Sequence, residues 1–190
     1  MNATIRVIAP WYGYYPILCD ALRLQTYAHW TLDLVHDGPE IRPHTGAWRA
    51  DPRITIRHTE RRYNDWGHSL RAEALTAERL AAAGRMPDYV VVTNADNYYA
   101  PPFLEAMLLM AAGRSGAYCD CVHSHYGWRL LPAALTLNHI DCGSLLVETD
   151  LAIAVGWPGR QFAADWQWIA ALLAKGGQFV HVAHPYFVHN

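Results

Sequence analysis

Short apolar runs alternate along this chain with longer segments in which apolar residues recur at helical spacing. The runs predict strands over residues 5–9, 31–36, 53–57, 89–93, 117–123, 144–148 and 178–182. The helical spacing predicts helices over residues 16–25, 68–83, 101–112 and 163–175. Strands that alternate with helices indicate an α/β fold with a mostly parallel central sheet flanked by helices. We expect a single domain over residues 1–190, since no repeat or linker interrupts the pattern.

The predicted elements also indicate where a ligand-binding site would lie. In open α/β sheets, ligands bind beyond the carboxyl ends of the strands. Asp37 follows the second predicted strand, and the segment 94–97 follows the strand at 89–93. In the helix over 68–83, the apolar face is predicted to hold Leu70, Ala74, Ala77 and Ala81, and the outer face Arg71, Glu78 and Arg85.

Composition narrows the class of protein. With 190 residues, of which 52% are hydrophobic and 17% charged, the chain has enough apolar material for a core and too little charge for a disordered protein. A net charge of −2 without a basic stripe argues against nucleic acid as the main partner. No apolar run approaches the roughly 20 residues that span a bilayer. Four scattered cysteines form no secreted-type framework, so we expect a reduced, cytoplasmic protein.

Two segments offer carboxylates at predicted strand ends. Asp96, with the amide oxygen of Asn94 or Asn97, provides the hard ligands that Mg²⁺ or Mn²⁺ prefers beside substrate phosphates. The same residues are frequent in ordinary polar turns, where they bond their own backbone. Asp37 could accept hydrogen bonds from a nucleobase or ribose, although Asp-Gly is also a common turn pair.

Asp165 lies at the start of the helix predicted over residues 163–175. A carboxylate there could cap the helix, because anions are favoured at helix N-termini. It could equally serve as a general base.

The segment 119–125 contains two cysteines and two histidines at alternating positions, which would share one face of a strand. A single zinc ion cannot take all four, since residues six apart on a strand are about 20 Å apart. We therefore do not expect a four-ligand zinc site.

Taken in order, the motifs resemble those of family 2 glycosyltransferases. Residues 7–12, 22–27 and 32–38 are similar to the family's opening, in which a strand ends in Pro, a helix ends in Gln-Thr-Tyr and a second strand ends in Asp-Asp-Gly. Residues 67–74 are similar to its Gly-x-x-x-Ala-Arg-Asn helix, and residues 91–105 to its Asp-x-Asp segment.

The second half of the chain carries the remaining similarity. Residues 141–147 resemble the acceptor-side strand, and residues 155–157 the Val-Gly-Gly segment. Residues 164–166 (Ala-Asp-Trp) are similar to the Glu-Asp-Trp segment, which holds the catalytic base. The resemblance covers about residues 5–176, nearly the whole chain.

The resemblance implies a GT-A fold and an inverting transfer of sugar from a nucleotide diphosphate sugar, with UDP the commonest donor nucleotide. It makes Asp165 the base and Asp96 a ligand of a divalent metal, Mn²⁺ or Mg²⁺. His184, or failing that His189, would be a further metal ligand. The nucleotide would contact Pro10, Tyr12, Asp37, Arg71, Asn94, Ala95 and Asp96.

Two departures from the family pattern keep other interpretations open. Asn94 stands where the family has its first metal-motif aspartate, and Ala164 where it has Glu before the base. A non-catalytic sugar-nucleotide or saccharide-binding domain is therefore an alternative.

Two other enzyme classes fit the sequence less well. A nucleotidyltransferase would need a Gly-rich basic loop after the first strand, which residues 10–15 do not provide. A metal-dependent hydrolase would need a paired-histidine motif at a strand end or on a helix, and none appears there. The acceptor could be a saccharide, a lipid, a protein or a modified nucleobase, and the chain could form a homodimer.

Overall fold

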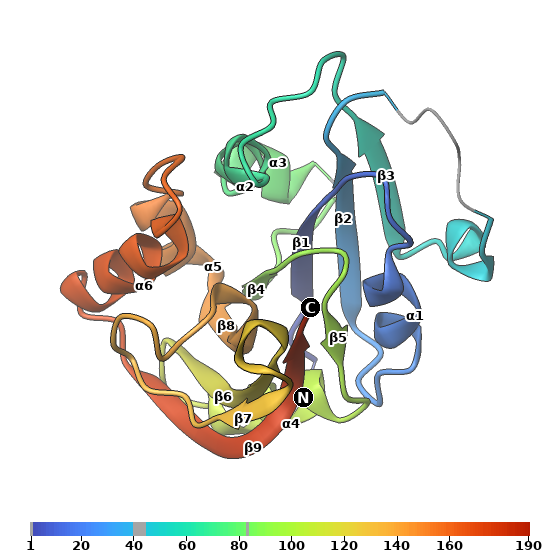
Figure 1. The fold of residues 1–190 in the computed structure, drawn as a ribbon. Coiled ribbons are helices and arrows are strands. Elements are labelled where there is room, and N and C mark those ends of the chain that lie inside the picture. Colours follow the sequence, from blue (N-terminus) through green and yellow to red (C-terminus); the bar gives the residue numbers. More distant parts are fainter. Residues whose placement is uncertain (1, 40–44, 83) are drawn as a thin grey trace.

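The computed structural model describes residues 2–39, 45–82 and 84–190. One curled sheet of nine strands forms its centre, in the order β3-β2-β1-β4-β8-β6-β9-β5, with β7 paired to β6 (Figure 1). The strands are β1 (Ile5–Trp11), β2 (Trp30–His36), β3 (Ile54–His58), β4 (Tyr89–Val92), β5 (Tyr98–Tyr99), β6 (Gly116–His123), β7 (Arg129–Leu131), β8 (Leu145–Glu148) and β9 (Phe179–His189).

Helices cover both faces of the sheet. They are α1 (Ile17–Arg23), α2 (His68–Ala74), α3 (Ala77–Ala81), α4 (Phe103–Met110), α5 (Thr149–Val155) and α6 (Ala164–Ala174). Alternation along β1 divides the core in two: Val7 packs in the cluster that includes α1 and α4, and Ile8 in the cluster that includes α2, α3, α5 and α6. Among the described helices, none combines the length and apolar composition that crossing a membrane requires.

The first half of the sheet is parallel, as the alternation of strands and helices predicts. β1 pairs in parallel with β2 and β4, and β2 with β3. Trp11 lies opposite His36, and Ile8 opposite Val92, so the carboxyl ends of β1, β2 and β4 meet at one edge. This register brings the residues after each strand to a common site.

The prediction of a mostly parallel sheet is wrong for the second half, where the sheet is mixed. β8 runs antiparallel to both β4 and β6, and β5 runs antiparallel to β9. Between β6 and β8 lie the hairpin strand β7 and two short 3₁₀ turns, Ser124–Tyr126 and Cys142–Ser144, and no α-helix crosses over, so the chain returns in the opposite direction. β9 follows α5 and α6 and pairs in parallel with β6.

β9 is much longer than the strand predicted over 178–182. A register shift divides it: Cys119 pairs with Val182, whereas Cys121 pairs with Phe187. Residues 183–186 form a bulge opposite the single residue between those two cysteines. Beyond the bulge, β9 also pairs with β5 and ends close to the residues that follow β4.

The helix predicted over 68–83 is two helices. The first ends at Ala74, and Thr76 caps the second by accepting a hydrogen bond from the Arg79 N–H through its hydroxyl oxygen, at 3.3 Å. Ala83, at the end of the predicted helix, lies outside the described residues. Arg71 is only 3% exposed, which contradicts its predicted place on the outer face.

Gly116, at the start of β6 between β8 and β9, should tolerate a side chain poorly. Its φ is +157°, and a Cβ placed on it would lie 1.9 Å from the carbonyl oxygen of Leu146. We expect Gly116→Ala to lower the free energy of unfolding by about 3 kcal/mol, measured by urea denaturation.

Gly113→Ala is the matched control, because Gly113 also has a positive φ (+71°), but a Cβ placed on it would have no other atom within 4 Å. Backbone strain alone should cost about 1–2 kcal/mol there. Equal losses in the two variants would show that the contact with Leu146 does not limit stability.

Candidate functional site

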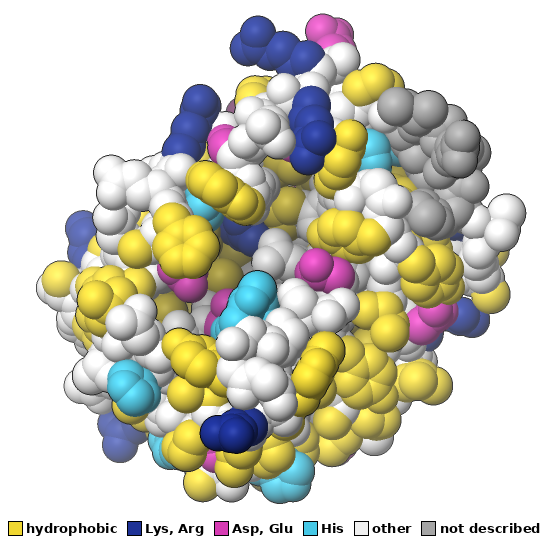
Figure 2. All heavy atoms as spheres, in the orientation of Figure 1, with side chains coloured by type: hydrophobic (Ala, Val, Ile, Leu, Met, Phe, Trp, Pro, Cys, Tyr) yellow, Lys and Arg dark blue, Asp and Glu magenta, His cyan; other side chains and the backbone are white. Residues whose placement is uncertain are grey.

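Two pockets adjoin at the edge where β1, β2 and β4 end. The sheet-edge pocket has a volume of about 570 Å³ and is lined by Pro10, Tyr12, Tyr14, Asp37, Asp96 and others. The α6 pocket, of about 670 Å³, is lined by Arg71, His123, Asp141, Asp165, Trp166, His189 and others. Trp66 and Asn94 line both pockets. Figure 2 shows this face of the molecule, with charged and histidine side chains gathered around a hollow.

Asp37 holds one wall of the sheet-edge pocket in place. Its carboxylate oxygens accept hydrogen bonds from the backbone N–H groups of Tyr63 (2.7 Å) and Asn64 (3.0 Å). Arg62, whose Nε is 3.8 Å from Asp37, also places its guanidinium over the ring of Tyr12, 3.4 Å from the centroid. Asp37 therefore anchors the loop 59–67, and its contact with a nucleobase stays a prediction.

Gly67 lets this loop approach β1 closely. Its φ is +80°, and a Cβ placed on it would lie 2.4 Å from the Cβ of Pro10. The preceding residue, Trp66, also has a positive φ of +55° and is 71% exposed. The loop thus presents an indole ring at the boundary of the two pockets, where planar ligand groups can stack on it.

Arg71 lies at the junction of the pockets. Its Nη1 donates to the carbonyl oxygen of Trp66 (2.8 Å), and its Nη2 donates to Oδ1 of Asn94. Its guanidinium carbon also lies 5.2 Å from the ring centroid of Trp157, within range of a cation–π interaction. The Asn94 oxygen thus accepts from a cation, and that positive charge opposes a metal ion at the same atom.

The residues after Asn94 divide between pocket and core. Burial raises the pKa of Asp96, and its Oδ1 is buried without a hydrogen-bond partner among the described residues. Ala95 is fully buried and lines neither pocket; its N–H donates to Pro10 O (3.2 Å), and its carbonyl accepts from Leu18 N (3.1 Å). Asn97 is buried too, and its side chain bonds Thr93 and the Asn190 N–H.

Asp165 lines the α6 pocket from the first turn of α6. Its Oδ1 accepts a hydrogen bond from the N–H of Trp166 (2.7 Å), but the N-cap position belongs to Ala163, so Asp165 is not the cap of this helix. Burial raises its pKa, and the negative charge of Asp141 raises it further. A carboxylate with a raised proton affinity in a pocket suits a general base, and that role stays a prediction.

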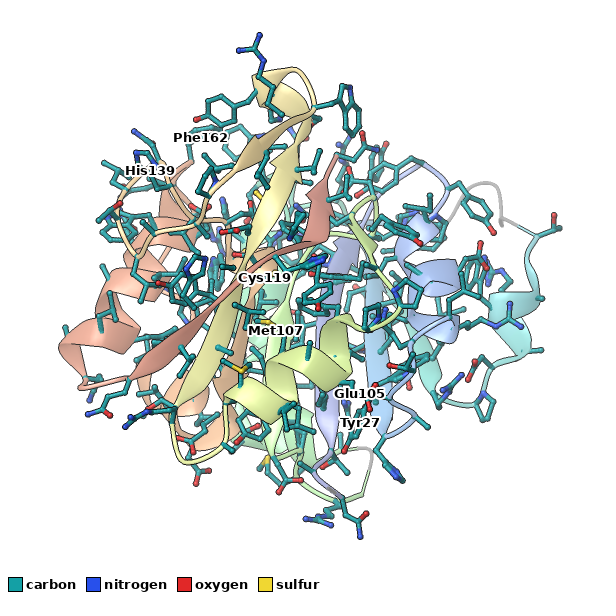
Figure 3. All side chains as sticks on the ribbon, turned by 90° about the horizontal axis from the view of Figure 1, so that it is seen from below. Tyr27, Glu105, Met107, Cys119, His139 and Phe162 are labelled. Atoms are coloured by element: carbon teal, nitrogen blue, oxygen red, sulfur yellow. The ribbon has the colours of Figure 1, made fainter. Side chains whose placement is uncertain are left out.

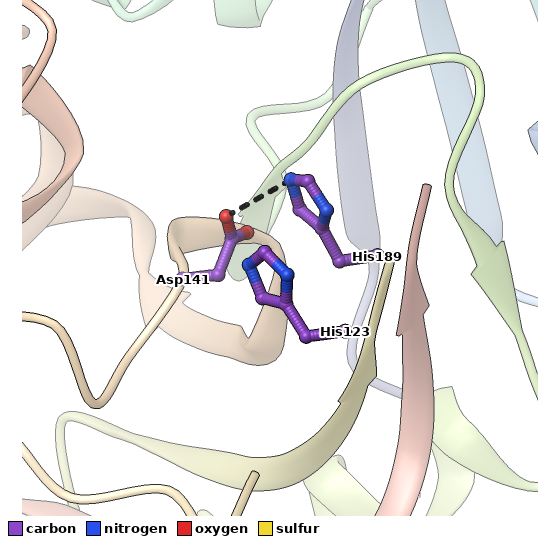
Figure 4. Close-up of side chains that lie close together, drawn as sticks. All are labelled: His123, Asp141 and His189. Atoms are coloured by element: carbon purple, nitrogen blue, oxygen red, sulfur yellow. Dashed lines mark ion pairs between the residues drawn. The ribbon is translucent and has the colours of Figure 1, made fainter. Parts of the chain in front are cut away.

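Sequence reasoning missed a cluster on the wall of the α6 pocket, formed by His123, Asp141 and His189 (Figure 4). The imidazole rings of His123 and His189 stack with centroids 4.1 Å apart, and Nε2 of His189 lies 3.7 Å from Oδ2 of Asp141. Burial lowers the pKa of both histidines, that of His123 to about 4.

Strand pairing explains why this cluster was missed. His123 lies directly opposite His189 in the parallel β6–β9 pair, but the sequence does not reveal which strands are neighbours. His184, the first choice as metal ligand, lies in the bulge of β9, where it is exposed and stacks on Tyr186. It lines neither of the two pockets.

The two cysteines of segment 119–125 are buried in the core and do not line the α6 pocket. Cys119 and Cys121 are buried in the core on the face covered by α4, where Figure 3 shows Cys119 close to Met107. Burial raises the pKa of both thiols, that of Cys121 to about 12. Among the described residues, neither cysteine belongs to the group of side chains spaced to hold a metal ion.

Comparisons with known proteins identify the fold. The sequence matches no protein-family model and no curated protein. Among solved structures, the chain is similar to TarS from S. aureus, a GT-A-like glycosyltransferase, with a TM-score of 0.74 and 13% identity over 98% of this chain. Structures of TarS 1–349 in complex with UDP and with UDP-GlcNAc give TM-scores of 0.74 and 0.70 at 14% and 13% identity, each over 97% of this chain.

This similarity shows a glycosyltransferase fold, and it does not extend to the whole of those proteins. The chain spans 36% of the length of the TarS structure and 60% and 58% of the two complexes. The expectation of a glycosyltransferase fold is thus confirmed, while membership of family 2 and the single domain over residues 1–190 stay predictions.

Removing the Asp37 carboxylate should release the loop that carries Trp66. Asp37→Ala leaves two backbone N–H groups without their charged acceptor, so we expect a loss of about 3 kcal/mol in the free energy of unfolding. Urea denaturation measures that loss, and faster proteolysis within residues 59–67 would report the loop. Asp37→Asn, which keeps one acceptor oxygen, should lose less; equal losses would mean that the second oxygen contributes little.

Proposed function

We propose that this chain transfers a sugar from a UDP-sugar to an acceptor hydroxyl, with inversion at the anomeric carbon. The observation that carries the proposal is the pair of adjoining pockets at the strand ends, with Asp37 on one and Asp165 on the other. Support comes from TarS, which has the same fold and has been captured with UDP and UDP-GlcNAc. The acceptor's class stays open.

The sheet-edge pocket suits the nucleotide. Tyr12 offers an aromatic ring, held under the guanidinium of Arg62, on which a base can stack. The diphosphate would then extend to the junction of the pockets. There the guanidinium of Arg71 would stabilise negative charge as it grows on the leaving UDP.

The α6 pocket suits the sugar and the acceptor. In the transfer, the acceptor oxygen bonds to the anomeric carbon, the bond from that carbon to the phosphate oxygen breaks, and the hydroxyl proton passes to Asp165. The raised pKa of Asp165 brings its proton affinity closer to neutral pH, where general bases are most effective. Trp66 and Trp166 provide apolar surface for sugar rings in the same pocket.

The metal site expected from the sequence fits only in part. Asp96 offers a buried carboxylate oxygen that has no partner among the described residues and could bind Mn²⁺ or Mg²⁺ together with substrate phosphates. Such an ion would neutralise charge on the leaving group. Asn94 is occupied by Arg71, however, and His184 lies away from both pockets. We therefore derive no step of the transfer through this ion.

The Asn94–Arg71 hydrogen bond also favours the alternative of a non-catalytic domain that binds sugar nucleotides. The bond places the positive guanidinium of Arg71 on the Asn94 oxygen, where a catalytic metal ion would need a negatively charged ligand. The two functions differ in turnover and agree in nucleotide binding.

Calorimetric titration with UDP and GDP, each with Mn²⁺ and with EDTA, tests the donor class. We expect UDP to bind at least about tenfold more tightly than GDP, which corresponds to about 1.4 kcal/mol. Binding that is equal with Mn²⁺ and EDTA would favour Arg71 over a metal ion at the diphosphate. The absence of binding to either nucleotide would contradict the proposal.

Asp165→Asn should separate catalysis from binding. An amide cannot take the acceptor proton, so we expect kcat for sugar transfer to fall by about 10²–10⁴. UDP affinity should stay within about twofold, because Asp165 lines the α6 pocket and not the sheet-edge pocket. A variant with normal turnover would remove Asp165 as the base.

The pH dependence of transfer gives an independent check. Only ionised Asp165 accepts a proton, so activity should fall as pH drops through its pKa. Because burial and the charge of Asp141 raise that pKa above the ordinary aspartate value of 3.8, the acidic limb of kcat against pH should lie above pH 3.8. The limb should be absent from the residual activity of Asp165→Asn, and its persistence there would assign it to another group.

A further inference from the structure

The cluster of His123, Asp141 and His189 is built by two strand ends and a loop. His123 and His189 end β6 and β9 and lie opposite each other, so their side chains leave the sheet on the same face. Asp141 precedes the short turn Cys142–Ser144, where its Oδ1 accepts a hydrogen bond from the Gly143 N–H at 2.7 Å. That bond orients the carboxylate, and its Oδ2 faces Nε2 of His189 (Figure 4).

The spacing of these groups is close to that of a metal site. One possible ligand atom from each residue lies within 4.8 Å of the others, and the His189–Asp141 pair is at 3.7 Å. In a tetrahedral site with bonds of about 2.1 Å, ligand atoms are about 3.4 Å apart. Small side-chain rotations would close the remaining difference, and the backbone positions need not change.

The donor atoms of the cluster also suit a cation. Two imidazole rings and one carboxylate offer nitrogen and oxygen atoms of the kinds that bind zinc-class ions. The Nδ1 of His189 is buried without a hydrogen-bond partner among the residues that the structure describes.

We propose that His123, Asp141 and His189 bind one divalent transition-metal ion of the zinc class, at a site that opens into the α6 pocket. Two imidazoles and one carboxylate favour Zn²⁺ and its neighbours over Mg²⁺ or Ca²⁺, which prefer all-oxygen sites. Three protein ligands leave a coordination position for water or for a substrate oxygen in the pocket. The proposal does not rest on the transferase function, because metal binding requires neither donor nor acceptor.

Metal binding at this site should move the turn Ser124–Tyr126. Nδ1 of His123 accepts a hydrogen bond from the His125 N–H at 3.2 Å. If Nε2 binds the ion, the ring proton resides on Nδ1, and two donors then face each other. The turn must release that contact, so the backbone amide of His125 should report metal binding by a change in its NMR chemical shift.

This site shares His189, the second choice of metal ligand from the sequence, but not Asp96 or His184, and that difference provides the control. His184 and His189 lie on the same strand, five residues apart, but only His189 is in the cluster. A metal ion held by Asp96 and His184 would depend on His184 and not on His123. The proposed site has the opposite dependence.

The test is a zinc titration of the full chain, without an affinity tag, after removal of metal with EDTA and desalting. Competition with a chromogenic chelator gives affinity and stoichiometry, and Co²⁺ absorption reports the coordination number. We expect one ion per chain. His123→Ala, Asp141→Asn and His189→Ala should each weaken Zn²⁺ binding at least about tenfold, and His184→Ala should leave it unchanged.

Thermal unfolding monitors the integrity of each variant. Excess Zn²⁺ should raise the Tm of the wild-type chain and of His184→Ala, because a ligand that binds the folded state stabilises it. It should not raise the Tm of the three cluster variants. If an alanine variant fails to fold without metal, the Gln substitution at the same histidine replaces it. Wild-type affinity in the His123 and His189 variants, or no stoichiometric binding by the wild-type chain, would overturn the proposal.

Discussion

A buried guanidinium dictates the arrangement of the site. Arg71 is 3% exposed, and among the described residues no carboxylate oxygen lies within 4.0 Å of it. A cation in such a place requires compensation, and it comes from the carbonyl of Trp66, the amide oxygen of Asn94 and the ring of Trp157. The guanidinium of Arg71 thereby holds together the loop 59–67, the turn after β4 and the segment before α6.

The same charge acts on the carboxylates around it. The positive charge of Arg71 lowers the pKa values of Asp96, Asp141 and Asp165, while burial raises all three by more. The single positive charge of Arg71 does not balance the three carboxyl groups around it. A bound metal ion would add to the positive charge that Arg71 offers an anionic diphosphate there. The cluster of His123, Asp141 and His189 lies where an ion would restore that balance.

The sequence was informative about elements and strand ends, and less so about how distant strands meet. Asp37, Asn94 and Asp96 follow strands whose apolar runs are unambiguous, so their place at the sheet edge could be predicted. The position of His123 beside His189 depends on the parallel pairing of β6 and β9, which local patterns do not encode. Neither do they encode the antiparallel direction of β8, which follows from the connection rather than from the strand itself.

Because of the bulge in β9, the number of residues in this strand can change without shifting its pairing register with β6. Residues 183–186 lie opposite a single residue of β6, and the ladder resumes at Phe187. An insertion within the bulge would lengthen an exposed excursion, whereas one added residue between Phe187 and His189 would turn the histidine to the other face of the sheet. Insertions should therefore be tolerated within residues 183–186, whereas an insertion after Phe187 would disrupt the histidine cluster. The bulge is accordingly a place to graft a spectroscopic probe that reads the site without entering it.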